Sequence, residues 1–118
     1  MTGTARTAAE EVDERATASG ARAGVVRVST FRAKPGQVAG LVGAAGENAH
    51  AARQATGCLS AEVCTSPDTA DTVLVISRWE SGSALRAFLD WHERLAHGAV
   101  SPYAVGKPRS VHYPVASR

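Results

Sequence analysis

The chain has 118 residues, a length that suits a single domain. Its 13 Lys and Arg residues nearly balance its 11 Asp and Glu residues, so a formal charge of +2 predicts neither nucleic-acid binding nor binding to a membrane. No apolar run approaches the roughly 20 residues that span a bilayer, and the first residues lack the apolar stretch of a secretion signal. We therefore expect a cytoplasmic protein.

Residues 1–23 are rich in Ala, Thr, Gly, Arg and Glu, and Val12 is their only branched aliphatic residue. Such a segment cannot bury enough apolar surface to offset the entropy lost on ordering. We expect a disordered tail over residues 1–23 and a folded domain over residues 24–118.

Hydrophobic periodicity divides the remainder into six elements. Alternation or a short apolar run predicts strands at 25–33, 58–65, 72–79 and 109–115, and helical spacing predicts helices at 37–55 and 84–96. In the first strand, Val26, Val28 and Thr30 fall on one face, whereas Val25, Arg27, Ser29 and Phe31 fall on the other. The inner face of the second helix is predicted to carry Ala84, Leu85, Phe88, Leu89 and Leu95, and His97-Gly98 is predicted to end it.

This order of strand, helix, strand, strand, helix and strand is that of the ferredoxin-like α+β fold with an antiparallel sheet. Val73 to Ile76 is apolar without alternation, so both faces of the third strand are expected to be buried. Two helices cover one face of a small sheet. A second copy of the sheet is the expected cover for the other, which predicts a homodimer.

Cys58 and Cys64 fall on one predicted strand, separated by about 20 Å at ~3.3 Å per residue. A disulfide needs Cα atoms within about 7 Å, so these two residues are expected to stay as free thiols.

Four short segments together resemble a known family. They are Val75-Ile76-Ser77-Arg78-Trp79-Glu80-Ser81, the helix start Ser83-Ala84-Leu85, Lys34-Pro35-Gly36 after the first strand, and Gly57-Cys58-Leu59 at the second. The set resembles the antibiotic biosynthesis monooxygenase family over roughly residues 25–115. The resemblance implies a dimeric α+β barrel.

Two branches of that family are relevant, and both act on a flat aromatic ligand held between the helices and the sheet. In one, cofactor-free oxygenases convert phenolic anthrones to quinones, and the deprotonated substrate itself reduces dioxygen. In the other, a His on the second helix ligates the iron of haem. The resemblance thus implies a small aromatic substrate, with either no cofactor or haem.

Five residues are candidates for the site. His92 is the candidate general base, because its reference pKa of about 6.5 suits proton abstraction near neutrality. Trp79, Trp91 and Phe88 are candidate walls for the ring, and Asn48 is a candidate hydrogen-bond donor to a ring oxygen. Four of them also have another interpretation: Trp79 as a core aromatic, Asn48 bonded to a neighbouring backbone group, His92 satisfied at the helix–sheet boundary, and Trp91 covering the dimer edge.

His97 lies eighteen residues after Trp79, a spacing that resembles that of the iron-ligating His in the haem-degrading branch. Asn48 and Ser29 stand where that branch carries Arg and Asn. Val75 stands where the cofactor-free branch carries a polar amide, so neither branch is matched fully.

The sequence favours a cofactor-independent monooxygenase acting on a phenolic or quinone-type, polyketide-like aromatic. Haem degradation through His97 is one alternative. A non-catalytic ligand binder, or an accessory to polyketide cyclisation, is the other.

Overall fold

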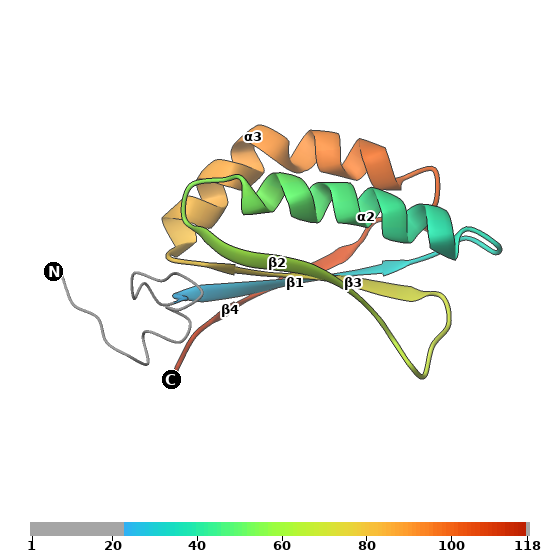
Figure 1. Cartoon of the computed structure of the whole chain (residues 1–118), viewed down its shortest axis with the longest axis horizontal. Coiled ribbons are helices and arrows are strands. Elements are labelled where there is room, and N and C mark those ends of the chain that lie inside the picture. The colour runs from blue at the N-terminus through green and yellow to red at the C-terminus, as the bar shows by residue number, and fades with distance from the viewer. Residues whose placement is uncertain (1–22, 118) are drawn as a thin grey trace, which may run out of the picture.

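The computed structural model describes residues 23–117. In chain order the elements are β1 (Val25–Arg32), α2 (Val38–Arg53), β2 (Cys58–Thr65), β3 (Thr72–Trp79), α3 (Gly82–Val100) and β4 (Arg109–Pro114). The strands form one antiparallel sheet in the order β2-β3-β1-β4, and both helices lie on one face of it (Figure 1). The predicted ferredoxin-like fold is therefore confirmed.

The two faces of β1 divide as its alternation predicts, because successive side chains of a strand point to opposite sides. Val25, Ser29 and Phe31 are buried on the face that the helices cover. On β3, which pairs with β1, the buried residues Val73, Ser77 and Trp79 lie on the same covered face.

The core consists of two clusters under the helices. One gathers around Leu41, Val73 and Val100, and the other around Trp79 and Leu85. Small residues of α2, including the buried Ala45 and Ala49, let that helix lie close to the sheet. Aliphatic and Ala packing thus supplies most of the core of a chain with only 5% aromatic residues.

The second helix, α3, is longer than the sequence predicts. Ser81 caps its start, and the Ser81 hydroxyl accepts a hydrogen bond from the Ala84 backbone N–H at 3.1 Å. The helix then runs through His97 and Gly98 to Val100, so the predicted end at His97-Gly98 is wrong. Val100 is buried in the core, and its burial outweighs the roughly 1 kcal/mol by which Gly disfavours a helix relative to Ala.

The sheet face opposite the helices carries a group of partly exposed apolar side chains, Val26, Val28, Leu74, Ile76 and Val111. Polar residues, including Glu62 on β2 and Arg78 on β3, lie on the same face. Neither α2 nor α3 lies on this side (Figure 1). Val73 of β3 is buried on the helix side, whereas Leu74 and Ile76 on the other side are only partly buried within residues 23–117. Burial of both faces of β3 therefore stays a prediction.

Cys58 and Cys64 are free thiols, both on β2. Strand β4 pairs only with β1 within residues 23–117, so Pro114 ends an edge strand as predicted. Ala23, the first described residue, is also buried. The rest of the predicted tail lies outside the described residues.

Between residues 23 and 117, no helix is both long and apolar enough to cross a membrane.

Gly57 precedes β2 with φ of +87°, and a Cβ there would lie 2.5 Å from the Cβ of Ala84. Gly57→Ala should therefore lower the free energy of unfolding by about 1–3 kcal/mol, since both strain and a clash oppose the side chain. Gly43→Ala is the matched control, because Gly43 is exposed within α2 and a Cβ there meets nothing within 4 Å. That variant should gain about 0.5–1 kcal/mol. Urea unfolding measures both, and equal effects would contradict the strain and the clash assigned to position 57.

Candidate active site

A cavity of about 350 Å³ lies between α3 and the covered face of the sheet. Helix α2 packs closely on β2 and β3, whereas α3 makes few close backbone contacts with the strands below it. The space left under α3 is floored by β1, β3 and β4. The volume falls near the lower end of the ~300–1,000 Å³ range of small-molecule pockets.

One wall of the cavity is apolar and aromatic. The rings of Trp79 and Phe88 lie with centroids 5.2 Å apart and planes tilted by 32°. Val75 and Leu85 extend this wall from β3 and α3. Trp79 is fully buried, so the partly exposed ring of Phe88 is the aromatic surface that this wall presents.

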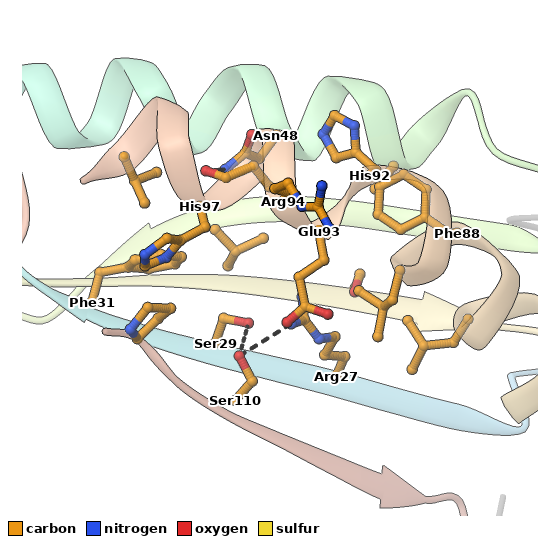
Figure 2. A pocket seen from close by; sticks show the side chains of 18 of the residues that line it. Arg27, Ser29, Phe31, Asn48, Phe88, His92, Glu93, Arg94, His97 and Ser110 are labelled. Atoms are coloured by element: carbon orange, nitrogen blue, oxygen red, sulfur yellow. Dashed lines mark hydrogen bonds between the residues drawn. The ribbon is translucent and has the colours of Figure 1, made fainter. Parts of the chain in front are cut away.

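A row of polar side chains forms the floor on β1 and β4. Ser29 and Ser110 lie directly opposite each other in the sheet, and their hydroxyl oxygens are 2.8 Å apart. Nη2 of Arg27 donates a hydrogen bond to Ser110 Oγ at 3.2 Å, as the dashed lines of Figure 2 show. The three residues thus form one connected polar row inside an otherwise apolar interior.

Arg27 and His112 interact at the end of this row. Nε of Arg27 donates to Nε2 of His112 at 3.2 Å. Burial lowers the pKa of His112 and the Arg27 charge lowers it further, while Glu93 acts in the opposite direction. The imidazole is therefore favoured in its neutral form, which can accept this hydrogen bond.

Arg27 itself is a partly desolvated cation. Burial lowers the pKa of its guanidinium, and the Glu93 carboxylate opposes that effect. The ion pair of Arg32 with Asp71, at 3.0 Å, is the only one among residues 23–117. Arg27 has no carboxylate partner within that part of the chain.

His92 lies at the other side of the cavity, beside α2 and away from the polar row (Figure 2). Its ring stacks on Phe88, with centroids 5.0 Å apart, and on Trp91 at 5.2 Å. Both ring nitrogens are buried and neither has a hydrogen-bond partner within residues 23–117. Buried polar atoms are normally paired, so this residue is exceptional.

The other predicted site residues divide between the cavity and the surface. Trp79, Phe88 and Asn48 line the cavity, as does His92. Two of them already make hydrogen bonds: Trp79 Nε1 donates to Ser77 Oγ at 2.9 Å, and Asn48 Nδ2 donates one of its two N–H groups to the Ala96 carbonyl at 3.2 Å. The structural interpretation therefore accounts for both hydrogen bonds, and Asn48 ties α2 to α3.

The structure does not bring Trp91 to the cavity. Its side chain is 69% exposed on the outer side of α3. Leu95, predicted on the inner face of this helix, is 64% exposed as well. Neighbouring residues of a helix are rotated by about 100°, so Trp91 and Leu95 turn away while His92 turns inward.

His97 lies in the last turn of α3 and also lines the cavity. Among residues 23–117, no group of three or more His, Cys, Asp or Glu side chains is placed to hold a metal ion.

Sequence reasoning missed the polar floor. Arg27 and Ser29 alternate with Val25 and Phe31, so a signal was present: two polar residues on a face that is otherwise apolar. Ser110 lies 81 positions from Ser29 in the chain, and only the strand pairing brings them together.

These features define a ferredoxin-like α+β protein with a small-molecule cavity between its helices and its sheet. The model of the family described as antibiotic biosynthesis monooxygenase matches residues 24–98. The chain belongs to this family, as the sequence resemblance predicts.

Solved structures extend the comparison. The chain is similar to a proposed antibiotic biosynthesis monooxygenase from Deinococcus radiodurans, with 21% identity, a TM-score of 0.72, and coverage of 80% of this chain and 94% of that one. It is similar to SnoaB, a cofactor-independent oxygenase from Streptomyces nogalater, with 15% identity, a TM-score of 0.70, and coverage of 81% and 96%. At such identities the likeness shows the fold alone. No curated protein matches the chain.

Proposed function

We propose that this protein is a cofactor-independent monooxygenase that oxidises a phenolic or quinone-type, polyketide-like aromatic in the cavity under α3. The observation that carries the proposal is His92, whose two buried ring nitrogens have no partner among residues 23–117. An imidazole whose lone pair is not already engaged can accept a proton from a bound substrate. Family membership supports oxygenase chemistry, and the description of SnoaB as cofactor-independent supports the absence of a cofactor.

The lining suggests how such a substrate would lie. The aromatic wall of Trp79 and Phe88 would hold the flat ring system. An oxygen at one end would accept hydrogen bonds from the row of Arg27, Ser29 and Ser110. The acidic C–H or O–H group would lie at the other side, next to His92.

The chemistry needs only the substrate and dioxygen. His92 takes a proton from the substrate, and the electron-rich anion gives an electron to O₂. Recombination forms a C–O bond, and the resulting hydroperoxide loses water to leave a carbonyl. For a CH₂ group, one oxygen atom enters the product and the other leaves as water with both substrate hydrogens, so atoms and electrons balance. His92 returns its first proton to the peroxide anion, which makes the hydroperoxide, and then moves the second C–H proton to the departing hydroxide.

We also propose a homodimer. The partly exposed apolar face formed by Val26, Val28, Leu74, Ile76 and Val111 supports it, since a second copy would bury these side chains. The free thiols of Cys58 and Cys64 suit a reducing compartment, and we propose the cytoplasm.

Haem degradation is the second candidate, because His97 lines the same cavity. Haem has four linked pyrrole rings and two propionate arms, and is larger than a three-ring phenol. A cavity of about 350 Å³ favours the smaller ligand. A cavity of this volume does not fit an enclosed haem.

His92→Ala should reduce oxygen uptake on a hydroxylated anthrone by about 10²–10⁴-fold, the usual contribution of a positioned base. His50→Ala is the matched control, because His50 is exposed on the outer side of α2. Oxygen-electrode rates measure both, with circular dichroism to verify folding. Unchanged uptake in His92→Ala would remove His92 from the mechanism. Saturable binding of the anthrone without any uptake by the wild type would instead support a non-catalytic binder.

Titration with haemin should give no stoichiometric Soret shift that depends on His97. Absorbance spectra of the wild type and of His97→Ala measure this. A stoichiometric shift in the wild type that is lost in His97→Ala would favour the haem-degrading function and contradict the cofactor-independent one.

Light scattering should give the wild type twice the mass of one chain. Ile76→Lys places a charge in the uncovered apolar face and should yield monomers, because an unpaired buried charge is costly at an interface. Ala87→Lys, at an exposed position on α3, should remain dimeric. A monomeric wild type would contradict the proposed dimer.

A further inference from the structure

The cavity under α3 has an excess of positive charge. Its lining includes the cations Arg27, Arg94 and Lys107 but a single carboxylate, Glu93. Cations that line a recess attract ligands of opposite charge, most strongly where low-dielectric walls limit screening. The charge balance therefore points to an anionic ligand.

The hydroxyl groups of the polar floor also favour an anionic ligand. Ser29 and Ser110 share one hydrogen bond, which uses one of their two hydroxyl hydrogens. The other hydrogen has no acceptor among residues 23–117. Ser77 accepts from the Trp79 indole, and its own hydroxyl hydrogen likewise has no acceptor within that range. The floor thus offers spare donors, and suits a ligand group that only accepts hydrogen bonds.

Arg27 is central to this arrangement. In the sheet it lies directly between Ser77 on β3 and His112 on β4. A guanidinium has five N–H groups, and Arg27 uses one at Nε and one at Nη2. The remaining three are on the two terminal nitrogens. These form the planar fork that binds both oxygens of a carboxylate.

We propose that Arg27, with the Ser29–Ser110 pair and Ser77, forms a subsite for a carboxylate carried by the aromatic ligand. Within the class of phenolic or quinone-type aromatics, the ligand is then a flat aromatic acid with one carboxylate at the end opposite His92. This deepens the proposed function and rests on it for the role of the aromatic wall.

The negative charge of Glu93 is expected to weaken carboxylate binding at this subsite. Its side chain extends from α3 toward Arg27 and Ser110 (Figure 2), yet it lies beyond the 4.0 Å limit of an ion pair with Arg27. Its charge is close enough to raise the pKa of Arg27. A bound carboxylate would face this negative charge, so Glu93 should weaken binding and select against ligands with a second acidic group nearby.

The test uses the matched probes 2-naphthoate and 2-naphthamide, which share a ring system and differ in charge. Isothermal titration calorimetry should show that the wild type binds the carboxylate about tenfold to a hundredfold more tightly than the amide, the range expected for charge-assisted hydrogen bonds. Arg27→Gln should abolish this preference. Arg32→Gln is the control, because Arg32 is exposed on the same strand and paired with Asp71. It should keep the preference.

Two further variants sharpen the result. Glu93→Gln should tighten naphthoate binding without changing that of naphthamide. Ser29→Ala should weaken naphthoate binding several-fold more than naphthamide binding. If circular dichroism shows that Arg27→Gln does not fold, Ser29→Ala tests the carboxylate subsite in its place. Equal affinity of the wild type for both probes, no measurable naphthoate binding, or a preference that survives Arg27→Gln or Ser29→Ala would overturn the proposal.

Neither probe carries an oxidisable phenol, so binding is measured without turnover. The subsite can therefore stand if His92 proves not to be a base. Conversely, oxygen uptake on neutral anthrones without any charge preference would leave the oxygenase standing and remove the carboxylate subsite.

Discussion

The fully buried indole of Trp79 connects the sheet, the helices and the cavity. Its backbone carbonyl accepts the Gly24 N–H at 2.7 Å, its ring packs against Phe88, and its own N–H is satisfied by Ser77 within the same strand. The buried Trp79 side chain anchors the end of β3, which lies three residues before the start of α3 at Gly82. The loss of so many dispersion contacts would cost several kcal/mol.

Burial and internal hydrogen bonds give Trp79 and Asn48 structural roles and leave the binding of a ligand to other residues. Because the Trp79 N–H is already bonded and the side chain is fully buried, the indole supports the cavity wall as part of the packed core. Asn48 is likewise used to join α2 to α3. The polar groups that remain free for a ligand include N–H groups of Arg27, hydroxyl hydrogens of the Ser29–Ser110 pair and of Ser77, and the ring nitrogens of His92 on α3. The cavity therefore has an apolar centre with different chemistry on two sides.

The sequence was sufficient for the order of elements and for the two faces of β1, since both follow from local periodicity. It was not sufficient for the end of α3. Gly98 is locally unfavourable to a helix, and only the burial of Val100 against residues far away in the chain reverses that preference. The surface position of Trp91 could have been predicted, because it follows from the helical rotation that turns His92 inward.

The candidate site was less predictable than the fold. The importance of Ser29 depends on Ser110, and strand pairing between the chain's two ends is not visible in either segment alone. The free nitrogens of His92 are also a property of the packed structure, since the sequence shows an imidazole but not what surrounds it.

Strand β4 links ligand binding to the stability of the sheet edge. It pairs only with β1 within residues 23–117, yet it supplies Ser110 to the polar floor and His112 as a partner of Arg27. A ligand bound to both β1 and β4 would link the two strands across the outermost pairing of the sheet. Occupancy would then protect the edge strand from peeling away, as any ligand specific for the folded state stabilises that state. Without a ligand this edge pairing lacks that added stability, and unpaired strand edges are where chains begin to aggregate.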